Sequence, residues 1–592
     1  MATKKRKTCL ESLPDELLLE LFKYVDIRDL FRIFDDLNSR FKRLLFDKYQ
    51  SYHIDFQSIS KTDFDLFCKK YLSLIAQQIN SFCFSDNDET PNLFDNFLSN
   101  GFNLTQFPNL NSLSFFHVAY IKRINTIFTN SFYSMSITRL KFNKCYFGLT
   151  QDFILLINYI WRLPKLRHCE LDVIDIYDRM FSGLTIVSSS IKFVLVKSIF
   201  FQSIDLSNLF ERTPHIQHLH ATLSEVNIQP LTNIALSIIK LNIFVRSSPF
   251  GMIELLKKTP NVRHLTVESW DFYFNGYQWK ETIENYLSKI KVFRFNMGYY
   301  LPNNENMLQQ LEEILNTYRT PFWLNEHCWY VRCDYNRNNR DENIHLYTLP
   351  YCSDRLTHLE SDTWYKTTCS NDRHYLSYDC VQELALMSTF SPSIHFYNIR
   401  SLFICLTEDL NIWSSIPTMY DLTSLSLELK YYSPQSHIIR AQIQTLFDRM
   451  HRLYSLRMNK SLVLHLLESR ITHRSIRRLD LIHSSDWEYD SAELFLLVNS
   501  PLGNQCEVLF IKVLCPKNIL DLINTMSNLR ALTCSIAPFR QLNSDDDDDS
   551  SSELNKDDLL WLQNHLSSTC SIRYKPLCQS NIQLWIQQYI DH

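Results

Sequence analysis

Residues 262–267 read Val262-Arg263-His264-Leu265-Thr266-Val267, and this stretch contains the pattern that decides the fold. Apolar residues occupy its first, fourth and sixth places, and polar residues fill the gaps. Alternation of this kind is typical of a strand with one buried face. The pattern therefore predicts a short strand that buries its apolar side chains and leaves Arg263 and His264 exposed.

The same pattern recurs at fourteen places, in two blocks, and within each block the copies begin 22 to 31 residues apart. A recurring interval of this length is typical of a solenoid of stacked repeats, because no single unit can bury its own apolar face. The copies begin at Leu110, Ile137, Leu166, Ile191, Ile216, Ile238, Val262, Ile290, Ile399, Leu422, Leu453, Ile476, Cys506 and Leu529.

Helical spacing of apolar residues occurs between the predicted strands, for example in residues 153–161, 253–256 and 443–450. Four strands follow a proline by two residues, and proline ends a helix and favours an extended segment. We therefore predict an α/β solenoid with one strand and one helix per repeat. The alternative is a generic α/β protein with crossover helices.

The period breaks over residues 296–398. A helix is predicted at 307–318, followed by two β-prone runs, 321–333 and 344–350, around a polar stretch that suggests a hairpin. This segment is either an inserted binding element or a bridge between the two blocks of repeats, and we favour the bridge.

Three short helices are predicted at the amino terminus. Pro14 fits the first turn of a helix, Asp26 can cap a second helix, and a third follows with Phe41 and Leu44. These helices carry more large apolar side chains than so small a unit can bury. Roughly half must therefore face the rest of the chain or another protein.

Residues 9–50 resemble the F-box, through Leu13-Pro14-Asp15-Glu16-Leu17-Leu18, the corner at residues 24–30 and the apolar third helix. Phe41 stands where many F-boxes carry Trp. The repeats resemble the irregular leucine-rich repeats found beside F-boxes. The resemblance implies docking onto the Skp-type adaptor of a cullin-based ubiquitin ligase by helix-in-groove contacts. The adaptor-binding residues that it implies are Leu13, Pro14, Leu17, Leu18, Leu21, Leu30, Phe31 and Phe41.

The expected organisation is a basic tail (1–8), an F-box (9–52), a helical linker (53–105), a first block of leucine-rich repeats (106–295), the bridge (296–398) and a second block (399–592). The second block is expected to include an acidic loop (543–555) and a carboxy-terminal cap formed by a helix over residues 582–590.

The positions between the apolar residues of each repeat are predicted to line an exposed inner sheet. Over the fourteen repeats, thirteen of these positions hold Lys or Arg and three hold Asp or Glu. Arginine matches carboxylate and phosphate oxygens with its planar fork, so this face is a candidate site for an acidic or phosphorylated target. The alternative is that these cations only solvate the sheet. The candidate residues are Arg139, Lys141, Arg167, Arg263, Lys291, Arg294, Arg400, Arg457, Arg477 and Arg478.

Composition excludes several classes of function. Seven glycines occur where average usage would give about forty, and no phosphate-cradling motif is present, which counts against nucleotide-using enzymes. A net charge of −4 makes nucleic acid an unlikely partner, and no apolar run is long enough to span a membrane. The sixteen cysteines are scattered and no secretory signal precedes them, so we expect reduced thiols in a cytoplasmic or nuclear protein. A basic cluster, residues 4–7, is either a nuclear localisation signal or a solvated tail.

We expect no cofactor, no metal and no catalytic residues. His168, His218 and His264 share one repeat position but lie in non-adjacent repeats, so we expect exposed side chains rather than metal ligands. The function expected is that of a substrate receptor, with adaptor and cullin at one end and an unknown target protein on the repeats. One rival is a repeat scaffold without a ligase. A second is a hydrolase using Cys328, Asp334 and His345.

Overall fold

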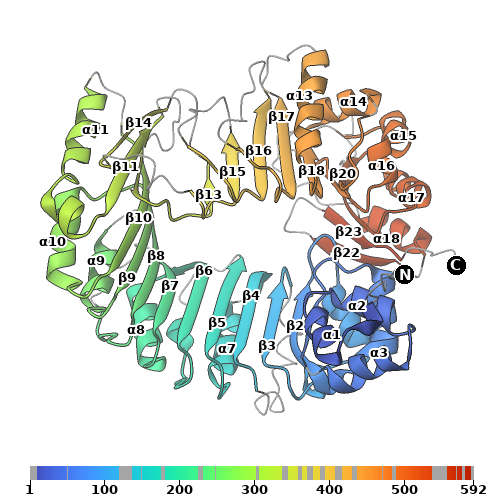
Figure 1. The fold of residues 1–592 in the computed structure, drawn as a ribbon, viewed down its shortest axis with the longest axis horizontal. Helices are drawn as coiled ribbons and strands as arrows, with labels where there is room; N and C mark the ends of the chain where they lie inside the picture. Colours follow the sequence, from blue (N-terminus) through green and yellow to red (C-terminus); the bar gives the residue numbers. More distant parts are fainter. Residues whose placement is uncertain are drawn as a thin grey trace, which may run out of the picture.

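The computed structural model describes residues 10–49, 51–118, 136–147, 150–174, 181–223, 231–246, 249–301, 306–336, 344–357, 363–369, 378–386, 394–406, 416–429, 436–469, 471–482, 488–536, 556–567, 570–575 and 581–587. Within these residues the fold is α/β, with a thirteen-stranded and a ten-stranded mixed sheet. The strands line the inside of a ring, and most helices lie outside it (Figure 1).

The first sheet runs in the order β1 to β10, then β12, β11 and β14, and β1 to β10 are all parallel. Its strands are β1 (Tyr52–Asp55), β2 (Ile79–Ser85), β3 (Ser112–Phe116), β4 (Arg139–Tyr146), β5 (His168–Ile174), β6 (Phe193–Phe201), β7 (His218–Leu223), β8 (Lys240–Arg246), β9 (His264–Trp270), β10 (Val292–Tyr299), β11 (Tyr330–Tyr335), β12 (Ile344–Leu349) and β14 (Trp364–Thr367).

The second sheet runs in the order β13, β15 to β21, β23 and β22, and it is parallel as far as β21. Its strands are β13 (Arg355–Leu356), β15 (Glu383–Leu386), β16 (Ser401–Leu406), β17 (Ser424–Leu429), β18 (Ser455–Met458), β19 (Arg478–Asp480), β20 (Val508–Val513), β21 (Ala531–Ile536), β22 (Ser571–Lys575) and β23 (Asn581–Trp585).

Helices connect the strands and cover the outer faces of the sheets (Figure 1). They are α1 (Asp15–Phe22), α2 (Ile27–Phe34), α3 (Ser39–Arg43), α4 (Lys61–Phe67), α5 (Leu93–Ser99), α7 (Thr150–Trp161), α8 (Ser203–Arg212), α9 (Phe250–Lys257), α10 (Gly276–Tyr286), α11 (Met307–Asn316), α13 (Ser436–Arg449), α14 (Lys460–Ser469), α15 (Ser491–Val498), α16 (Pro501–Asn504), α17 (Pro516–Thr525) and α18 (Lys556–His565).

The fourteen predicted strands are confirmed as β3 to β10 and β16 to β21. Their apolar positions are buried, apart from the half-buried Ile290, and they form the two large cores. In β5, β8 and β9 buried side chains alternate with exposed or half-buried ones, as expected for a sheet with one covered face. The predicted α/β class with repeated strand–helix units therefore agrees with the structure.

Two predictions about the boundaries of the array are wrong. Residues 53–105 are not a helical linker, because β1 and β2 lie there and extend the parallel sheet. The break at 296–398 is also shorter than predicted, since β13 and β15 begin the second sheet inside it.

The predicted hairpin is confirmed. Strands β11 and β12 pair antiparallel, and β12 lies between β10 and β11 in the first sheet. The hairpin therefore stands where the first sheet ends, before the second begins, as expected of a bridge. The polar turn at residues 337–343 lies outside the described residues.

The predicted carboxy-terminal helix is wrong over its described part. Residues 581–585 form the strand β23, which pairs antiparallel with β21 and β22. The basic tail (1–8), with the cluster at 4–7, and the acidic loop (543–555) lie outside the described residues.

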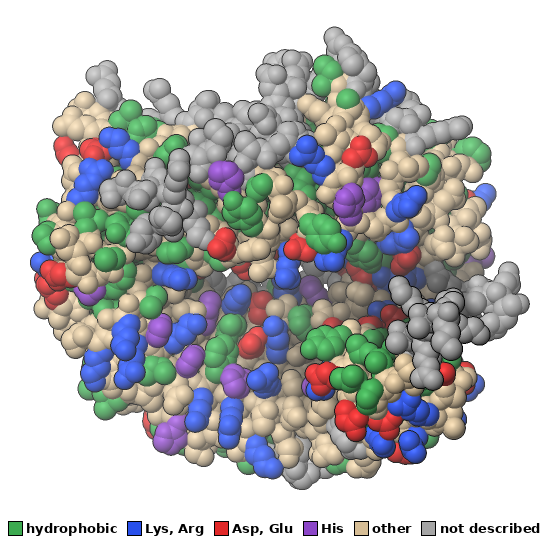
Figure 2. Space-filling view, viewed as in Figure 1, with side chains coloured by type: hydrophobic (Ala, Val, Ile, Leu, Met, Phe, Trp, Pro, Cys, Tyr) green, Lys and Arg blue, Asp and Glu red, His purple; other side chains and the backbone are tan. Residues whose placement is uncertain are grey.

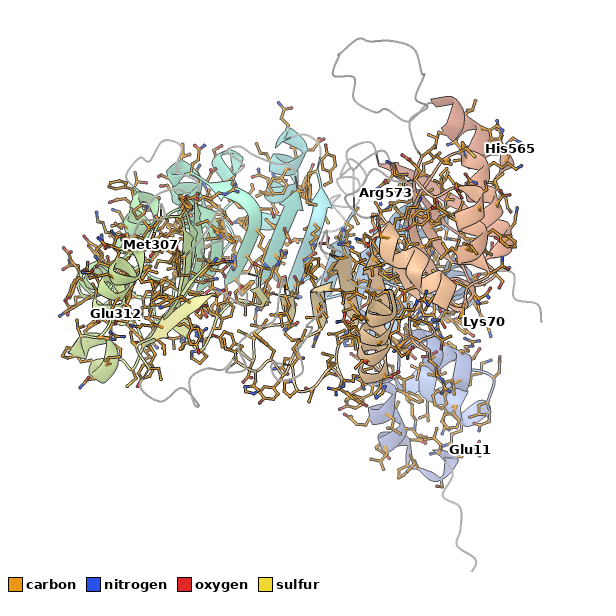
Figure 3. All side chains as sticks on the ribbon, turned by 90° about the horizontal axis from the view of Figure 1, so that it is seen from above. Glu11, Lys70, Met307, Glu312, His565 and Arg573 are labelled. Carbon is orange, nitrogen blue, oxygen red and sulfur yellow. The ribbon has the colours of Figure 1, made fainter. Side chains whose placement is uncertain are left out.

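The two ends of the array meet and close the ring. Arg573, in β22, places Nη1 2.8 Å from the carbonyl oxygen of Asp86, and Asn92 Nδ2 lies 2.9 Å from the carbonyl oxygen of Ile572. The ring of Trp585 packs against that of Phe64 at 5.4 Å, inside the core of the first block. In Figure 3 the labelled Lys70 and Arg573 lie on this side of the ring, and Met307 and Glu312 lie on the opposite side.

Candidate functional site

The first candidate site is the amino-terminal helical unit, residues 10–49. Its core is aromatic: Phe34 packs on Phe22 at 5.2 Å and stacks on Phe41 at 5.0 Å. Asp26 caps α2 by accepting from the N–H of Arg28 at 2.9 Å, as predicted. Pro14 stands at the N-cap of α1 rather than in its first turn.

An ionic clamp holds α1 against α3. Arg40 donates from Nε and Nη2 to Asp15 at 2.9 and 2.7 Å, and Lys48 donates to the same carboxylate at 2.8 Å. These hydrogen bonds from Lys48 and Arg40 lower the pKa of Asp15 to about 2. The carboxylate therefore stays charged, and the clamp stays intact, well into the acidic range.

The structure divides the predicted adaptor-binding residues into two groups. Leu17 and Leu21 lie one turn apart on α1 and are 52% and 43% exposed, while Pro14 is exposed and Leu13 is half-buried. Four others are wrong as docking residues, because each is at most 2% exposed and belongs to the core: Leu18, Leu30, Phe31 and Phe41. A side chain in the core cannot touch a partner unless the unit unfolds.

Four exposed apolar residues of the unit were missed: Leu10, Tyr24, Ile33 and Leu37 are 44%, 81%, 54% and 50% exposed. Hydrophobic side chains gather over these helices in Figure 2. Helical spacing would have found three of them, because Leu17, Leu21 and Tyr24 follow an i, i+4, i+7 stripe, and Ile33 and Leu37 follow an i, i+4 stripe. Leu10 lies before α1, in a short 3-10 turn. We call these four residues together with Leu17 and Leu21 the apolar docking stripe.

The helical unit is joined firmly to the array. Phe31 stacks on Tyr71 at 4.5 Å, and Asp35 accepts from Lys70 at 2.8 Å and from the hydroxyl of Tyr71 at 3.1 Å. The hydrogen bond to Asp35 raises the pKa of Lys70 above its ordinary value. Viewed from above in Figure 3, the unit projects from the ring, with the labelled Glu11 near its far end.

The second candidate site is the inner face of the first sheet. Arg139, Arg167, Arg263, Lys291 and Arg294 are exposed there. In Figure 2 Lys, Arg and His side chains gather along this arc of the ring. Lys141 is the exception among the predicted cations of this block, because it pairs with Glu170 at 3.1 Å.

The cations of the second block are mostly engaged within the chain. Arg457 pairs with Asp480 at 2.6 Å, and Arg477 pairs with Glu507 at 3.3 Å. This block also carries Asp354, directly before β13, and Glu383, the first residue of β15; the sequence analysis predicted neither strand. Arg400 is exposed. The unpaired surplus of cations on the predicted inner face therefore lies in the first block.

An internal carboxylate occupies the inner face of the second block. Glu89, in the loop after β2, accepts from Arg530 Nη2 at 2.8 Å, from Arg478 Nη1 at 3.0 Å and from the hydroxyl of Tyr454 at 3.1 Å. Burial opposes ionisation of Glu89, but the charges of Arg530 and Arg478 hold its pKa below the ordinary value. We call these four residues the Glu89 latch.

Of the residues in the hydrolase alternative, Asp334 and His345 lie opposite each other on β11 and β12. Asp334 accepts from Arg332 at 2.7 Å and from the hydroxyl of Tyr347 at 2.6 Å, so the structure commits it to a buried network at the bridge. Cys328 is exposed, and His327 stacks on Trp329 at 4.1 Å. Within the described ranges, no three His, Cys, Asp or Glu side chains are grouped as metal ligands would be.

No protein-family model matches the chain, and no curated protein sequence is significantly similar to it. Among the helices of the described residues, none has the length and apolar character needed to cross a bilayer.

Proposed function

We propose that residues 10–49 are an F-box, that the strand–helix units are degenerate leucine-rich repeats, and that the chain is the substrate receptor of a cullin-type ubiquitin ligase. The observation that carries the proposal is the apolar docking stripe. Its side chains lie outside the buried aromatic core of the unit and are open to a partner.

The energetics of the stripe favour a partner. Burying a fully exposed large apolar side chain gains about 1.5–3 kcal/mol, and apart from Tyr24 the side chains of the stripe are about half exposed. Covering them would therefore contribute roughly 1 kcal/mol each to the free energy of a complex. Leu17 and Leu21 lie one turn apart on α1, and Tyr24 lies in the turn directly after it, so the three offer successive anchors for helix-in-groove recognition. The adaptor then brings the cullin, and the chain makes no bonds itself.

The geometry also suits a receptor. The helical unit projects from one side of the ring and is fixed to it by the contacts of Phe31 and Asp35 (Figure 3). A target protein on the inner face would therefore be held at a defined place relative to the ligase. Transfer of ubiquitin would follow from proximity.

The experiment that tests the adaptor role is co-purification of a Skp-type adaptor and cullin with the tagged full-length chain. The test variant is Leu17→Asp with Leu21→Asp, which changes exposed residues and leaves the core alone. The matched control is Ile234→Asp with Leu236→Asp, since these side chains are 59% and 61% exposed on the array.

We expect recovery of the adaptor with the wild type and the control, and loss with the test variant. Equal recovery from all three chains would show that the docking stripe is not the adaptor site. Recovery from none would favour the scaffold, in which the repeats bind partners without a ligase.

A further inference from the structure

The inner face of the first sheet carries two cross-strand rows of basic and polar side chains. The strand register aligns the second row across ten strands, and its members are His53, Ser81, Ser112, Arg139, His168, Phe193, His218, Lys240, His264 and Val292. Backbone hydrogen bonds link the first row, which consists of Asn80, Asn111, Thr138, Arg167, Lys192, Gln217, Ile239, Arg263 and Lys291. All the ionisable residues of both rows are bases.

The rows are open to a ligand. Arg139, Arg167, Lys192, Lys240, Arg263 and Lys291 are all exposed. Phe193 lies between two histidines, with ring centroids 5.6 Å from His168 and 6.0 Å from His218. At the β1 end the rows run into a polar depression of about 350 Å³, lined by His53, Ser81, Asn111, Ser112, Thr138 and Arg139.

The second block provides an internal example of what such positions bind. Arg530 directly precedes β21, as Arg263 directly precedes β9, and Arg478 begins β19, as Arg139 begins β4. Together Arg530 and Arg478 hold the carboxylate of Glu89. The same places in the repeat thus already bind an acidic polypeptide side chain, which favours a protein ligand over a nucleic acid.

We propose that the two rows bind an acidic segment of a partner protein, with carboxylate or phosphate groups, and that binding strengthens as the pH falls because His168 and His218 gain charge. The proposal rests on the proposed function only in identifying that partner as the ligase substrate. Strands β4 to β10 span about 29 Å at ~4.8 Å per strand, which is the length of roughly nine extended residues.

The charges around the histidines set the direction of the pH dependence. His168 faces Arg139, Arg167 and Glu170; burial and the charge of Arg139 lower its pKa, while Glu170 opposes this. His218 faces Lys240, His168 and His264; burial and the charge of Lys240 lower its pKa.

His264 lies beside Lys240 in the register, with Arg263 next to it in the chain. A bound anion stabilises the protonated forms of His168 and His218. Affinity therefore rises as pH falls through their pKa values in the complex, and levels off below the values of the free protein.

The test is fluorescence anisotropy with the purified full-length chain and no adaptor. Three labelled probes are used: a peptide of twelve glutamates, a peptide of alternating phosphoserine and glycine, and an oligonucleotide of twelve deoxythymidines. The glutamate peptide serves for the pH series, because its carboxylates stay ionised at pH 6, whereas a phosphoserine begins to lose charge there.

We expect the glutamate peptide to bind at least about threefold more tightly at pH 6 than at pH 7.5. Arg167→Ser with Arg263→Ser should weaken binding about tenfold at both pH values. His168→Gln with His218→Gln and His264→Gln should remove the pH dependence while leaving most of the affinity at pH 7.5. Arg162→Ser with Lys280→Ser removes the same charge outside the rows, and it should change neither the affinity for the glutamate peptide nor the pH dependence of that affinity.

Four results would overturn the proposal: no binding of either peptide, equal binding by the arginine variant, affinity independent of pH, or tighter binding of the oligonucleotide than of both peptides. A preference for the phosphoserine or the glutamate peptide at pH 7.5 distinguishes the two sources of negative charge. The anisotropy assay contains no adaptor, so its outcome is independent of the co-purification assay. The peptide-binding proposal and the adaptor proposal can therefore fail separately.

Discussion

Glu89 and Arg530 are separated by 441 positions in the chain, yet their carboxylate and guanidinium groups are 2.8 Å apart. Both side chains are buried, at 6% and 7% exposure. This ion pair joins the loop after β2 to the last parallel strand of the other sheet. It therefore connects the two ends of the array.

Replacing the carboxylate should destabilise the closed ring. Glu89→Gln removes the countercharge of Arg478 and leaves Arg530 with Glu507 alone, at 3.2 Å. Removing one member of a buried ion pair costs about 3–5 kcal/mol, and we expect the lower end of that range because Arg530 keeps a partner. Urea unfolding followed by circular dichroism measures the change. Glu281→Gln, at an exposed position of α10, is the control and should change the free energy of unfolding by less than about 0.5 kcal/mol. Equal stability of the two variants would show that the latch contributes nothing.

The latch should also weaken in acid. The pKa of Glu89 lies below its ordinary value of 4.5, so its contribution is fully present above that pH and is lost as the pH falls through the value in the folded protein. We expect the difference in unfolding free energy between the wild type and Glu89→Gln to shrink steadily below about pH 4.5. A difference that stays constant down to pH 3 would contradict this assignment.

Substitution by alanine should destabilise the helical unit strongly at a core residue and hardly at all at an exposed residue of the docking stripe. Phe41 is fully buried against Phe34, so Phe41→Ala should destabilise the unit by about 3–5 kcal/mol. Leu17→Ala should cost less than about 0.5 kcal/mol, because that side chain is 52% exposed. Hydrogen exchange of the α1 and α3 amides, measured without adaptor, distinguishes the two. Loss of protection in Leu17→Ala would place Leu17 in the core.

The buried pair at the bridge should show strong coupling. Arg332 and Asp334 are 3% and 1% exposed in their side chains, and Arg332 also lies over the ring of Tyr365 at 4.2 Å. Arg332→Met and Asp334→Leu should each cost about 3–5 kcal/mol. The double variant should recover part of that loss, because no unpaired charge remains. Strictly additive losses in urea unfolding would exclude a direct interaction.

Most of the array could be predicted because the apolar period records which side chains enter the core. The same signal was present for two strands that were missed. Ile79, Phe82 and Phe84 have the pattern at β2, and Val381, Leu384 and Leu386 have it at β15. Strand β13 could not be predicted from the apolar pattern, because it has only two residues and Leu356 is the buried one.

The sites were less predictable because they depend on distance in space. Within α1, Leu17 and Leu18 look alike in the sequence, but the direction of each side chain on the helix makes one exposed and the other buried. The pairing of Glu89 with Arg478 and Arg530 depends on the accumulated curvature of both sheets. No local pattern of residues records that curvature.

Closure of the ring also decides how a ligand can enter. An open arc can be threaded from either end by an elongated partner, but here the Glu89 latch and the packing of Trp585 on Phe64 join the ends. The described ends of the array are therefore not free for an elongated partner to enter between the two sheets. A partner must approach the inner strands over the rim of the ring, which favours a protruding loop or tail over the bulk of a folded domain.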